Sequence, residues 1–469
     1  MEVFLIKAAQ LIVALALLVI IHEFGHYIIA RAFGIKVEKF YLFFNPWFSL
    51  YKWKPKDKGH KLDKNGQPRA SWRDTEYGIG WLPLGGYVKI AGMIDESMDK
   101  EQMAQPVQPW EFRAKPAWQR LCVMIAGVCF NFILAILIYA GIAFWWGNKY
   151  VPLDKATEGM QFSEAAIKGG FRNGDIPLSA DGKKLDMSQT DFLYLMADAK
   201  KVDVLRKAES DTVLLHETRP VLRDTVTLSL PDKFIFKLSE SEDPVMSYRW
   251  PVIVKSAVGG SAAAEAGIES GDRIAAIGGV PTPSFFELTE QLKKNAGKQV
   301  AVTLHRNGKV MTVTATPDSD GKLGVNLKLV DEIYPVNYEK YSFLQSFPKG
   351  WEIGTTKLGT YVSAMGHVFS AEGAKSIGGF GALGGMFPEK WDWLSFWEIT
   401  AFLSVVLAFM NIIPIPGLDG GHVMFLLWEV ITRRKVNEKV LEYAQYAGML
   451  FLLLLLVYAN GADIVRALL

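Results

Sequence analysis

Four stretches of this chain are each long and apolar enough to cross a lipid bilayer as a helix, which takes about 20 residues. We predict these spans at residues 1–31, 117–146, 394–430 and 440–462. The third is longer than one span and contains prolines, so we expect its helix to be broken. The apolar run at residues 11–21 has the length of a signal-peptide core, but no small-residue cleavage site follows it, so we expect a retained helix. The segments predict a polytopic α-helical membrane protein with four transmembrane helices.

Composition agrees with a membrane protein and argues against a nucleic-acid partner. Half of the residues, 50%, are hydrophobic and only 21% are charged, which is more apolar than an ordinary soluble enzyme. The 51 Lys and Arg residues almost balance 49 Asp and Glu, and the net charge of +2 is too small to indicate nucleic-acid binding. Lysines and arginines are concentrated in the connections 32–116 and 431–439, so we expect both on the cytoplasmic side. Both termini and the segment between the second and third spans are then expected on the other side.

This extracytoplasmic segment contains an internal repeat. Residues 163–176 and 261–274 share a serine, a pair of alanines and a Gly-Asp pair in the same order, and an apolar strand and a turn follow each copy. The pattern resembles two tandem PDZ domains, at residues 147–240 and 241–332. A PDZ domain can bind a peptide C-terminus by adding a strand to its sheet edge. The alternative is that the pair only fills space as a steric filter, and the sequence favours neither use.

Residues 333–393 are predicted to form amphipathic linker helices, because apolar residues between 341 and 369 recur at helical spacing. One interpretation is a helix that lies on the membrane surface. The other, packing against a PDZ domain, is favoured by the usual behaviour of amphipathic helices.

A motif that can carry chemistry lies inside the first span and reads His22-Glu23-Phe24-Gly25-His26. Positions i and i+4 share one face of a helix, so the two imidazoles can bind one metal ion while Glu23 stands beside it, able to take a proton from water. Ionisable residues at membrane depth are costly and mark functional sites. The alternative is a pair of structural histidines satisfied by their neighbours. We favour metal ligation by His22 and His26, with Glu23 as general base.

A catalytic zinc site needs a third protein ligand and one open position. The candidate is Asp419, in the segment 411–422 where two prolines and three glycines interrupt the third span. Irregular backbone at membrane depth is tolerated only where it lines a protein-enclosed or watery cavity. A carboxylate that caps the next helix at Gly420 is the alternative. His422 competes as a ligand, and we expect a supporting or packing role for it.

Together these motifs resemble the site-2 protease family of intramembrane zinc metalloproteases. The resemblance rests on the first-span motif, on the segment Asn411-x-x-Pro-x-Pro-x-x-Asp419-Gly, on the tandem PDZ pattern and on residues 76–89, and it covers nearly the whole chain. It implies Zn²⁺ as the cofactor, held by His22, His26 and Asp419.

The same resemblance assigns the role of general base to Glu23 and the holding of substrate near the site to Asn411. It implies a membrane-re-entrant β-hairpin at about residues 74–90, whose edge strand could pair with an unwound substrate helix. The residues assigned to substrate binding in this hairpin are all glycines: Gly78, Gly80, Gly85 and Gly86. Relatives carry Gly-x-Gly where this chain has residues 43–45, so we expect a different backbone contact there.

The implied function is hydrolysis of a peptide bond in or near the transmembrane segment of a single-span membrane protein, after site-1 trimming has removed the outer domain of the substrate. The implied substrates are an anti-sigma factor and remnant signal peptides. The implied location is the bacterial inner membrane, where the chain contacts the lipid bilayer, with the PDZ domains outside and the active site towards the cytoplasm. Two other functions remain open from the residues alone: a non-catalytic PDZ receptor for trimmed membrane proteins, and a metal transporter.

Overall fold

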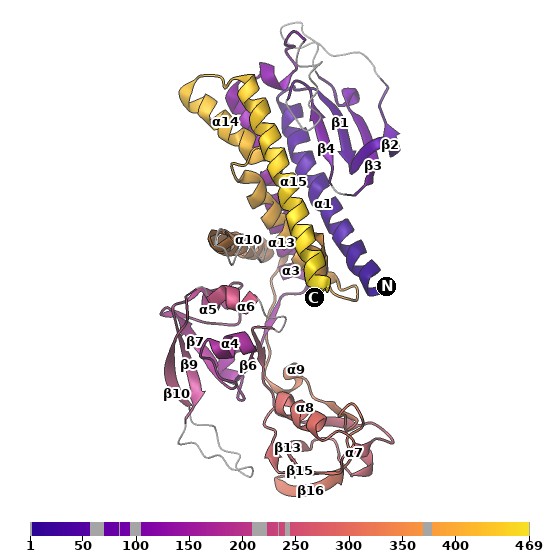
Figure 1. Ribbon diagram of the computed structural model, residues 1–469, viewed down its shortest axis with the longest axis vertical. Coiled ribbons are helices and arrows are strands. Elements are labelled where there is room, and N and C mark those ends of the chain that lie inside the picture. Colours follow the sequence, from indigo (N-terminus) through magenta and orange to yellow (C-terminus); the bar gives the residue numbers. More distant parts are fainter. Residues whose placement is uncertain are drawn as a thin grey trace. The chain divides into compact units, whose positions relative to one another are not determined.

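The computed structural model describes residues 2–56, 70–83, 85–93, 105–208, 223–232, 234–239, 244–368 and 378–468. The chain forms two compact units (Figure 1). One consists of Met1–Gly147 together with Lys340–Leu469, and the other of Asn148–Glu339.

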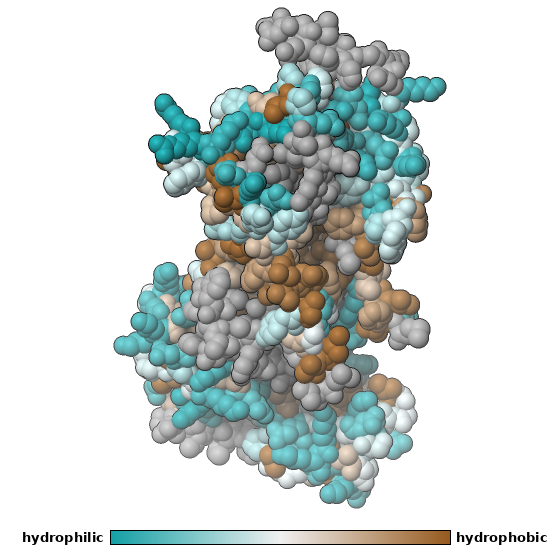
Figure 2. Space-filling model, turned by 45° about the horizontal axis from the view of Figure 1, so that its top comes forward, coloured by the Kyte–Doolittle hydropathy of each residue, from teal (hydrophilic) through white to brown (hydrophobic). Residues whose placement is uncertain are grey.

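The first unit contains the predicted spans as helices: α1 (Glu2–Ala32), α3 (Ala117–Trp145), α13 (Trp393–Ile412) and α15 (Glu438–Leu468). Among the described residues, four helices are long and apolar enough to cross a membrane, and they lie in these elements. Figure 2 shows hydrophobic side chains gathered over the helices of this unit and hydrophilic ones at the end where its sheet and loops lie. The prediction of a polytopic α-helical membrane protein is therefore confirmed.

The third span is broken, as its prolines predict. α13 ends before the irregular segment 413–418, and α14 (Asp419–Thr432) follows it. Gly417 in this segment has a φ of +96°, a conformation that favours glycine. α15 leaves room for the segment at Gly448, where a Cβ atom would lie 1.6 Å from the carbonyl oxygen of Pro416. The break therefore depends on a close contact with the fourth span as well as on the prolines.

Helix α3 is the centre of the first unit, because α1, α10 (Phe343–Val368), α13 and α14 all pack against it. α1 approaches at Gly25, where a Cβ atom would lie 2.7 Å from the carbonyl oxygen of Ala126. α10 approaches at Gly350, where a Cβ atom would lie 2.6 Å from the backbone nitrogen of Ala140. Small residues at crossings allow membrane helices to pack closely. α3 is thus placed to support side chains that project from α1.

Helix α10 belongs to the linker for which the sequence left two interpretations. Figure 1 shows α10 nearly end-on, whereas α1 and α15 run in the plane of the view, so its axis crosses theirs. It packs on α3 and α13, and on α13 the ring of Tyr361 meets the edges of Phe402 and Phe409. Within the first unit, its packing partners are therefore helices that can span a membrane. A further short helix of the linker is α12 (Phe380–Gly385), and α9 (Val330–Ile333) ends where the predicted linker begins.

A four-stranded sheet lies beside α1, composed of β1 (Val37–Leu42), β2 (Phe44–Trp53), β3 (Glu76–Leu82) and β4 (Tyr87–Ile90). The strand order is β2-β3-β1-β4, so the predicted hairpin of residues 74–90 is wrong in its pairing. β1 lies between the two strands, parallel to β3 and antiparallel to β4. Extended segments can be read from sequence, but a strand that inserts between them from elsewhere cannot.

Glycines make room for the inserted strand. A Cβ atom at Gly78 would lie 2.2 Å from Cε1 of Tyr41, and one at Gly86 would lie 2.7 Å from the carbonyl oxygen of Tyr41. The Tyr41 side chain is buried and its hydroxyl donates to Oε1 of Glu76 at 2.7 Å. The Tyr41 ring can therefore lie over β3 at this point because residue 78 has no side chain.

The second unit consists of two lobes with similar element order. The first lobe contains β6 (Met160–Phe162), α4 (Glu164–Lys168), β7 (Ile176–Ala180), β8 (Lys183–Lys184), α5 (Phe192–Asp198), β9 (Lys201–Lys207), β10 (Arg223–Ser229), α6 (Phe234–Ser239) and β11 (Met246–Tyr248). The second contains β12 (Val254–Ala257), α7 (Ala262–Glu265), β13 (Arg273–Ile277), β14 (Val280–Pro281), α8 (Phe285–Lys294), β15 (Val300–Arg306), β16 (Lys309–Ala315) and β17 (Val325–Leu327). Their four-stranded sheets have the orders β10-β9-β7-β8 and β14-β13-β15-β16. β5 (Asn148–Tyr150) and β18 (Asn337–Glu339) pair where the chain enters and leaves the unit.

The internal repeat is visible as two matching ion pairs. In the first lobe, Nε and Nη2 of Arg206 donate to Asp175 at 2.9 and 2.7 Å. In the second, the same atoms of Arg306 donate to Asp272, both at 2.7 Å. Each arginine also donates to the carbonyl oxygen of a nearby glycine. The aspartates of the two Gly-Asp pairs therefore tie the same turn to the same strand in both lobes.

Candidate metal centre

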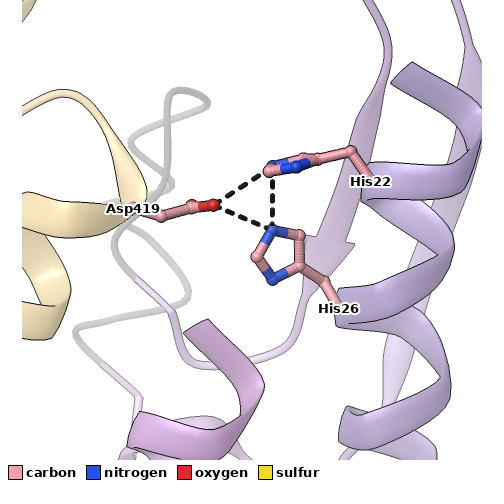
Figure 3. Close-up of side chains that lie close together, drawn as sticks. All are labelled: His22, His26 and Asp419. Carbon is pink, nitrogen blue, oxygen red and sulfur yellow. Dashed lines mark hydrogen bonds and ion pairs between the residues drawn. The ribbon is translucent and has the colours of Figure 1, made fainter. Parts of the chain in front are cut away.

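Two side chains of α1 and one from the start of α14 converge on one point. Nε2 of His22 and Nε2 of His26 lie 3.2 Å apart, and each lies 3.1 Å from Oδ2 of Asp419. Both histidines are buried. Figure 3 shows the two imidazoles projecting from the same face of α1 towards the carboxylate. The three residues are the ones that the sequence singled out.

Asp419 reaches the histidines because of the break in the third span. It is the first residue of α14, and Leu418 occupies the N-cap position, so the alternative of a capping carboxylate is wrong. Gly420 lets the backbone turn tightly here, because a Cβ atom there would lie 2.1 Å from the carbonyl oxygen of Ile413. The carboxylate is thereby directed at α1.

A backbone carbonyl of helix α3 orients the imidazole of His26. Nδ1 of His26 lies 2.8 Å from the carbonyl oxygen of Val123, and only a protonated Nδ1 can donate to that oxygen. The neutral imidazole then has its free lone pair on Nε2, the atom that faces His22 and Asp419. Metal-ligating histidines are held in this way by an acceptor for the other ring nitrogen.

Asn131, also on α3, holds the second imidazole. Its side-chain nitrogen lies 3.2 Å from Nδ1 of His22, and its Oδ1 has no hydrogen-bond partner among the described residues although it is buried. If Nε2 of His22 binds a metal, Nδ1 carries the proton and needs an acceptor. Rotating the Asn131 amide by half a turn supplies that acceptor and pairs the orphaned oxygen. Asn131 can therefore support a His22 that binds a metal through Nε2.

Gly127 keeps the space beside the imidazoles open. A Cβ atom at this position would lie 2.4 Å from Nε2 of His26 and 2.7 Å from Cε1 of His22. Sequence analysis gave no role to Gly127 or Asn131. The available signals were a buried-type amide in an otherwise apolar span and an Ala-Gly step one helical turn before it. Their role follows from the packing of α3 against α1.

Glu23 directly follows His22 and connects the site to the sheet. Its carboxylate lies close to the backbone N–H of Val88 in β4. Gly86, just before β4, lies so close to α1 that a Cβ atom there would be 2.8 Å from Cγ1 of Val19. An edge strand of the sheet therefore runs along α1 next to the candidate base.

The remaining predicted site residues lie outside the group formed by His22, His26 and Asp419. Asn411 is half-buried near the end of α13, and His422 is half-buried in α14, outside the three-residue group. Gly80 and Gly85 pack against Phe44, because Cβ atoms there would lie 2.1 Å from its carbonyl oxygen and 2.8 Å from its Cε2. The glycines assigned to substrate thus have a packing reason within the sheet, and their role in substrate binding stays a prediction.

The donor set fits zinc. Two imidazole nitrogens and one carboxylate oxygen, all close enough to share one ion, leave a fourth tetrahedral position, which is the arrangement of catalytic zinc sites. The two remaining imidazole nitrogens have acceptors at Val123 and, after the amide rotation, at Asn131. The arrangement can therefore hold a metal that activates water beside a carboxylate base.

Comparison with known proteins gives matches over almost the full length. The model described as Peptidase family M50 matches residues 10–62 and 67–455. The regulator of sigma-E protease RseP from Escherichia coli K12 is 30% identical over 497 residues, 99% of this chain and 99% of the relative. RseP from Salmonella typhimurium 14028s is 29% identical over 488 residues, 98% of each chain. The regulator of sigma E protease from Haemophilus influenzae is 28% identical over 484 residues, 99% of each.

Proposed function

Because the chain belongs to peptidase family M50 and is a zinc metalloprotease, we propose that it cleaves the transmembrane segments of single-span membrane proteins inside the bilayer. The observation that carries the proposal is the convergence of His22, His26 and Asp419 on one point beside membrane-spanning helices. Hydrolysis there requires water and a metal at membrane depth, which the broken third span can admit.

We assign His22, His26 and Asp419 as the zinc ligands. When bound, zinc supplies Lewis-acid chemistry, lowering the pKa of water towards neutrality and polarising the scissile carbonyl. Glu23 takes the proton from the attacking water and later returns one to the leaving amine. The backbone N–H of Val88 lies beside the Glu23 carboxylate, and Asn131 and Val123 hold the imidazoles.

Substrate presentation is assigned to β4. A peptide bond inside an intact helix is shielded by its own hydrogen bonds, so a substrate helix must unwind before it is cut. β4 is an edge strand and touches Glu23, so an unwound segment that adds to its free edge would lie beside the base. Asn411, near the start of the break in the third span, would hold the other side of that segment.

The two lobes of the second unit are assigned as PDZ domains outside the cytoplasm. Their shared element order, sheets and ion pairs support this assignment. They would admit substrates already trimmed by a site-1 protease, either by binding the new C-terminus or by excluding bulky outer domains. The relatives named as regulators of sigma-E suggest an anti-sigma factor as substrate, with remnant signal peptides as a second class. The enzyme would lie in a bacterial inner membrane with its site towards the cytoplasm.

The test uses two reporters that share one transmembrane helix, reconstituted with the full chain in liposomes. One has a short outer end and the other carries a folded domain there. We expect the short reporter to be cut at least about tenfold faster, and neither to be cut by Glu23→Gln. Equal rates would remove the trimming requirement while leaving the protease assignment intact. Failure to cut any of several short reporters by folded, zinc-loaded enzyme would contradict the proposed substrate class.

A further inference from the structure

Strand β2, at the edge of the sheet opposite β4, exposes an unusual number of large apolar side chains. Trp47 is 90% exposed and Leu50 65% exposed. The other exposed members of this group are Phe48, Tyr51 and Trp53. Trp47 and Phe48 also stack on Trp81 of β3, at ring-centroid distances of 5.9 and 5.8 Å. An apolar cluster of this extent on a protein surface indicates a partner.

Contacts between the sheet and α1 fix the level of this cluster along the helix. The Tyr77 hydroxyl lies 2.7 Å from that of Tyr27, Val88 reaches Glu23, and Gly86 touches Val19. At 1.5 Å per residue these three α1 positions lie about 6, 12 and 18 Å from Arg31, the charged end of the helix. The strands therefore run from the interface to about the middle of a bilayer whose apolar core is about 30 Å thick.

The register of β2 gives the cluster a direction. Trp53 lies opposite Tyr77 at the level of the interface, whereas Phe44 lies opposite Leu82 at the deep end. Trp47 and Phe48 fall between Phe44 and Ser49, so they occupy the deep half of the strand. The aromatic residues thus extend from the interface into the apolar layer.

The backbone at the deep end is poorly suited to pairing with another strand. Pro46 has no N–H, and its carbonyl oxygen accepts a hydrogen bond from Nε1 of Trp81 at 2.8 Å. The register shifts between Phe44 and Ser49, and Trp47 has a φ of +71°, a conformation that is rare for a bulky residue. Pro46 therefore leaves fewer unsatisfied polar groups facing lipid, and the register shift and the Trp47 conformation interrupt the edge as a partner for another strand.

The shallow end of the same strand is basic. Lys52, Lys54 and Lys56 are exposed where β2 ends. Aromatic side chains at the interface, with lysines just outside it, are the pattern by which proteins bind anionic membrane surfaces. A peptide strand is disfavoured by the interrupted edge, and neither it nor a second copy would explain the lysines.

We propose that β2 and Trp81 form an interfacial membrane wedge whose aromatic residues enter the lipid leaflet and whose lysines bind anionic phospholipid headgroups. The proposal rests on the membrane placement in the proposed function but does not require protease activity. Each lysine close to an anionic leaflet favours binding by about fivefold. The surface would therefore fix the height of the sheet, and with it the β4 edge, relative to the bilayer.

The depth test places an environment-sensitive fluorophore at Trp47→Cys in the full chain, with Cys122 and Cys129 replaced by serine, in liposomes without substrate. The matched control is Val280→Cys, an exposed position in the second unit. We expect lipids brominated in their acyl chains to quench the label at position 47 several times more than at 280. Equal quenching at the two positions would overturn the proposal. It would mean that a second copy of the chain or water, and not lipid, covers the strand.

The headgroup test places the same fluorophore at Tyr51→Cys and compares quenching by nitroxide-labelled phosphatidylglycerol and phosphatidylcholine at equal mole fraction. We expect a ratio above about 2, falling to about 1 when Lys52, Lys54 and Lys56 are changed to glutamine. The same change at three exposed lysines of the second unit, Lys293, Lys298 and Lys309, should leave the ratio unchanged. A ratio that is near 1 before any lysine is changed, or that does not fall when Lys52, Lys54 and Lys56 are changed together, would overturn the headgroup assignment. Reporter cleavage measured on the same samples separates this outcome from failure of the proposed function.

Discussion

The side-chain amide of Asn131 on α3 lies 3.2 Å from Nδ1 of His22 on α1, with its Oδ1 buried and unpartnered among the described residues. The backbone of the same residue is held by α13, because the hydroxyl of Ser404 donates to the backbone carbonyl oxygen of Asn131 at 2.7 Å. Three spans thus cooperate in setting one imidazole. A metal at Nε2 of His22 requires Nδ1 to donate, so metal binding at this imidazole is coupled to the acceptor that Asn131 offers.

The first prediction concerns that coupling. Asn131→Ala removes the acceptor, and we expect zinc affinity to fall about 10- to 100-fold, the usual effect of losing such a partner. Asn131→Asp keeps an acceptor and should retain most of the affinity. Competition with a chelator measures both, independently of cleavage. If alanine and aspartate weaken zinc binding equally, the residue acts only in packing.

Space beside the imidazoles gives the second prediction. Gly127→Ala would place a Cβ atom 2.4 Å from Nε2 of His26, so the helix or the imidazole must move. We expect a loss of about 1–3 kcal/mol in stability and more than about tenfold in zinc affinity. Gly141→Ala on the same helix meets nothing within 4 Å and should bind zinc normally. Equal zinc affinity in the two variants would show that α3 does not approach α1 as described.

The third prediction concerns pH and the second lobe. Hydrogen bonds from Arg306 hold the pKa of Asp272 below its usual value. The unfolded state therefore binds the proton more readily, so the stabilisation is present above the unfolded pKa of about 3.9 and is lost as pH falls through the lower folded value. We expect Asp272→Asn to destabilise the lobe by about 1–3 kcal/mol at neutral pH, with a smaller deficit in acid.

Hydrogen exchange of segments within residues 244–332, measured in the full chain, reports this difference. Asp320→Asn is the matched control, because that exposed carboxylate pairs with the exposed Lys322. It should change protection little at any pH. A deficit for Asp272→Asn that does not shrink in acid would contradict the ion-pair explanation.

Much of the site could be predicted because its ligands obey local rules. The spacing of His22 and His26 fixes them on one helix face, and the prolines before Asp419 require a break in the span. The partners on α3 could not be predicted, because helix crossing depends on which small residues meet across two spans. The same limit explains the wrong hairpin: nothing in residues 74–90 shows that Tyr41 will lie over Gly78 and insert β1.

The most direct test of the account measures zinc content and reporter cleavage together, for the wild type and for Glu23→Gln, with and without a zinc chelator. The account predicts that both proteins hold one zinc per chain, that Glu23→Gln cuts a short single-span reporter about 10²- to 10⁴-fold more slowly, and that chelation stops the wild type. Undiminished cleavage by Glu23→Gln, or by the chelated wild type, would contradict the assignment of His22, His26, Asp419 and Glu23 as a zinc hydrolase.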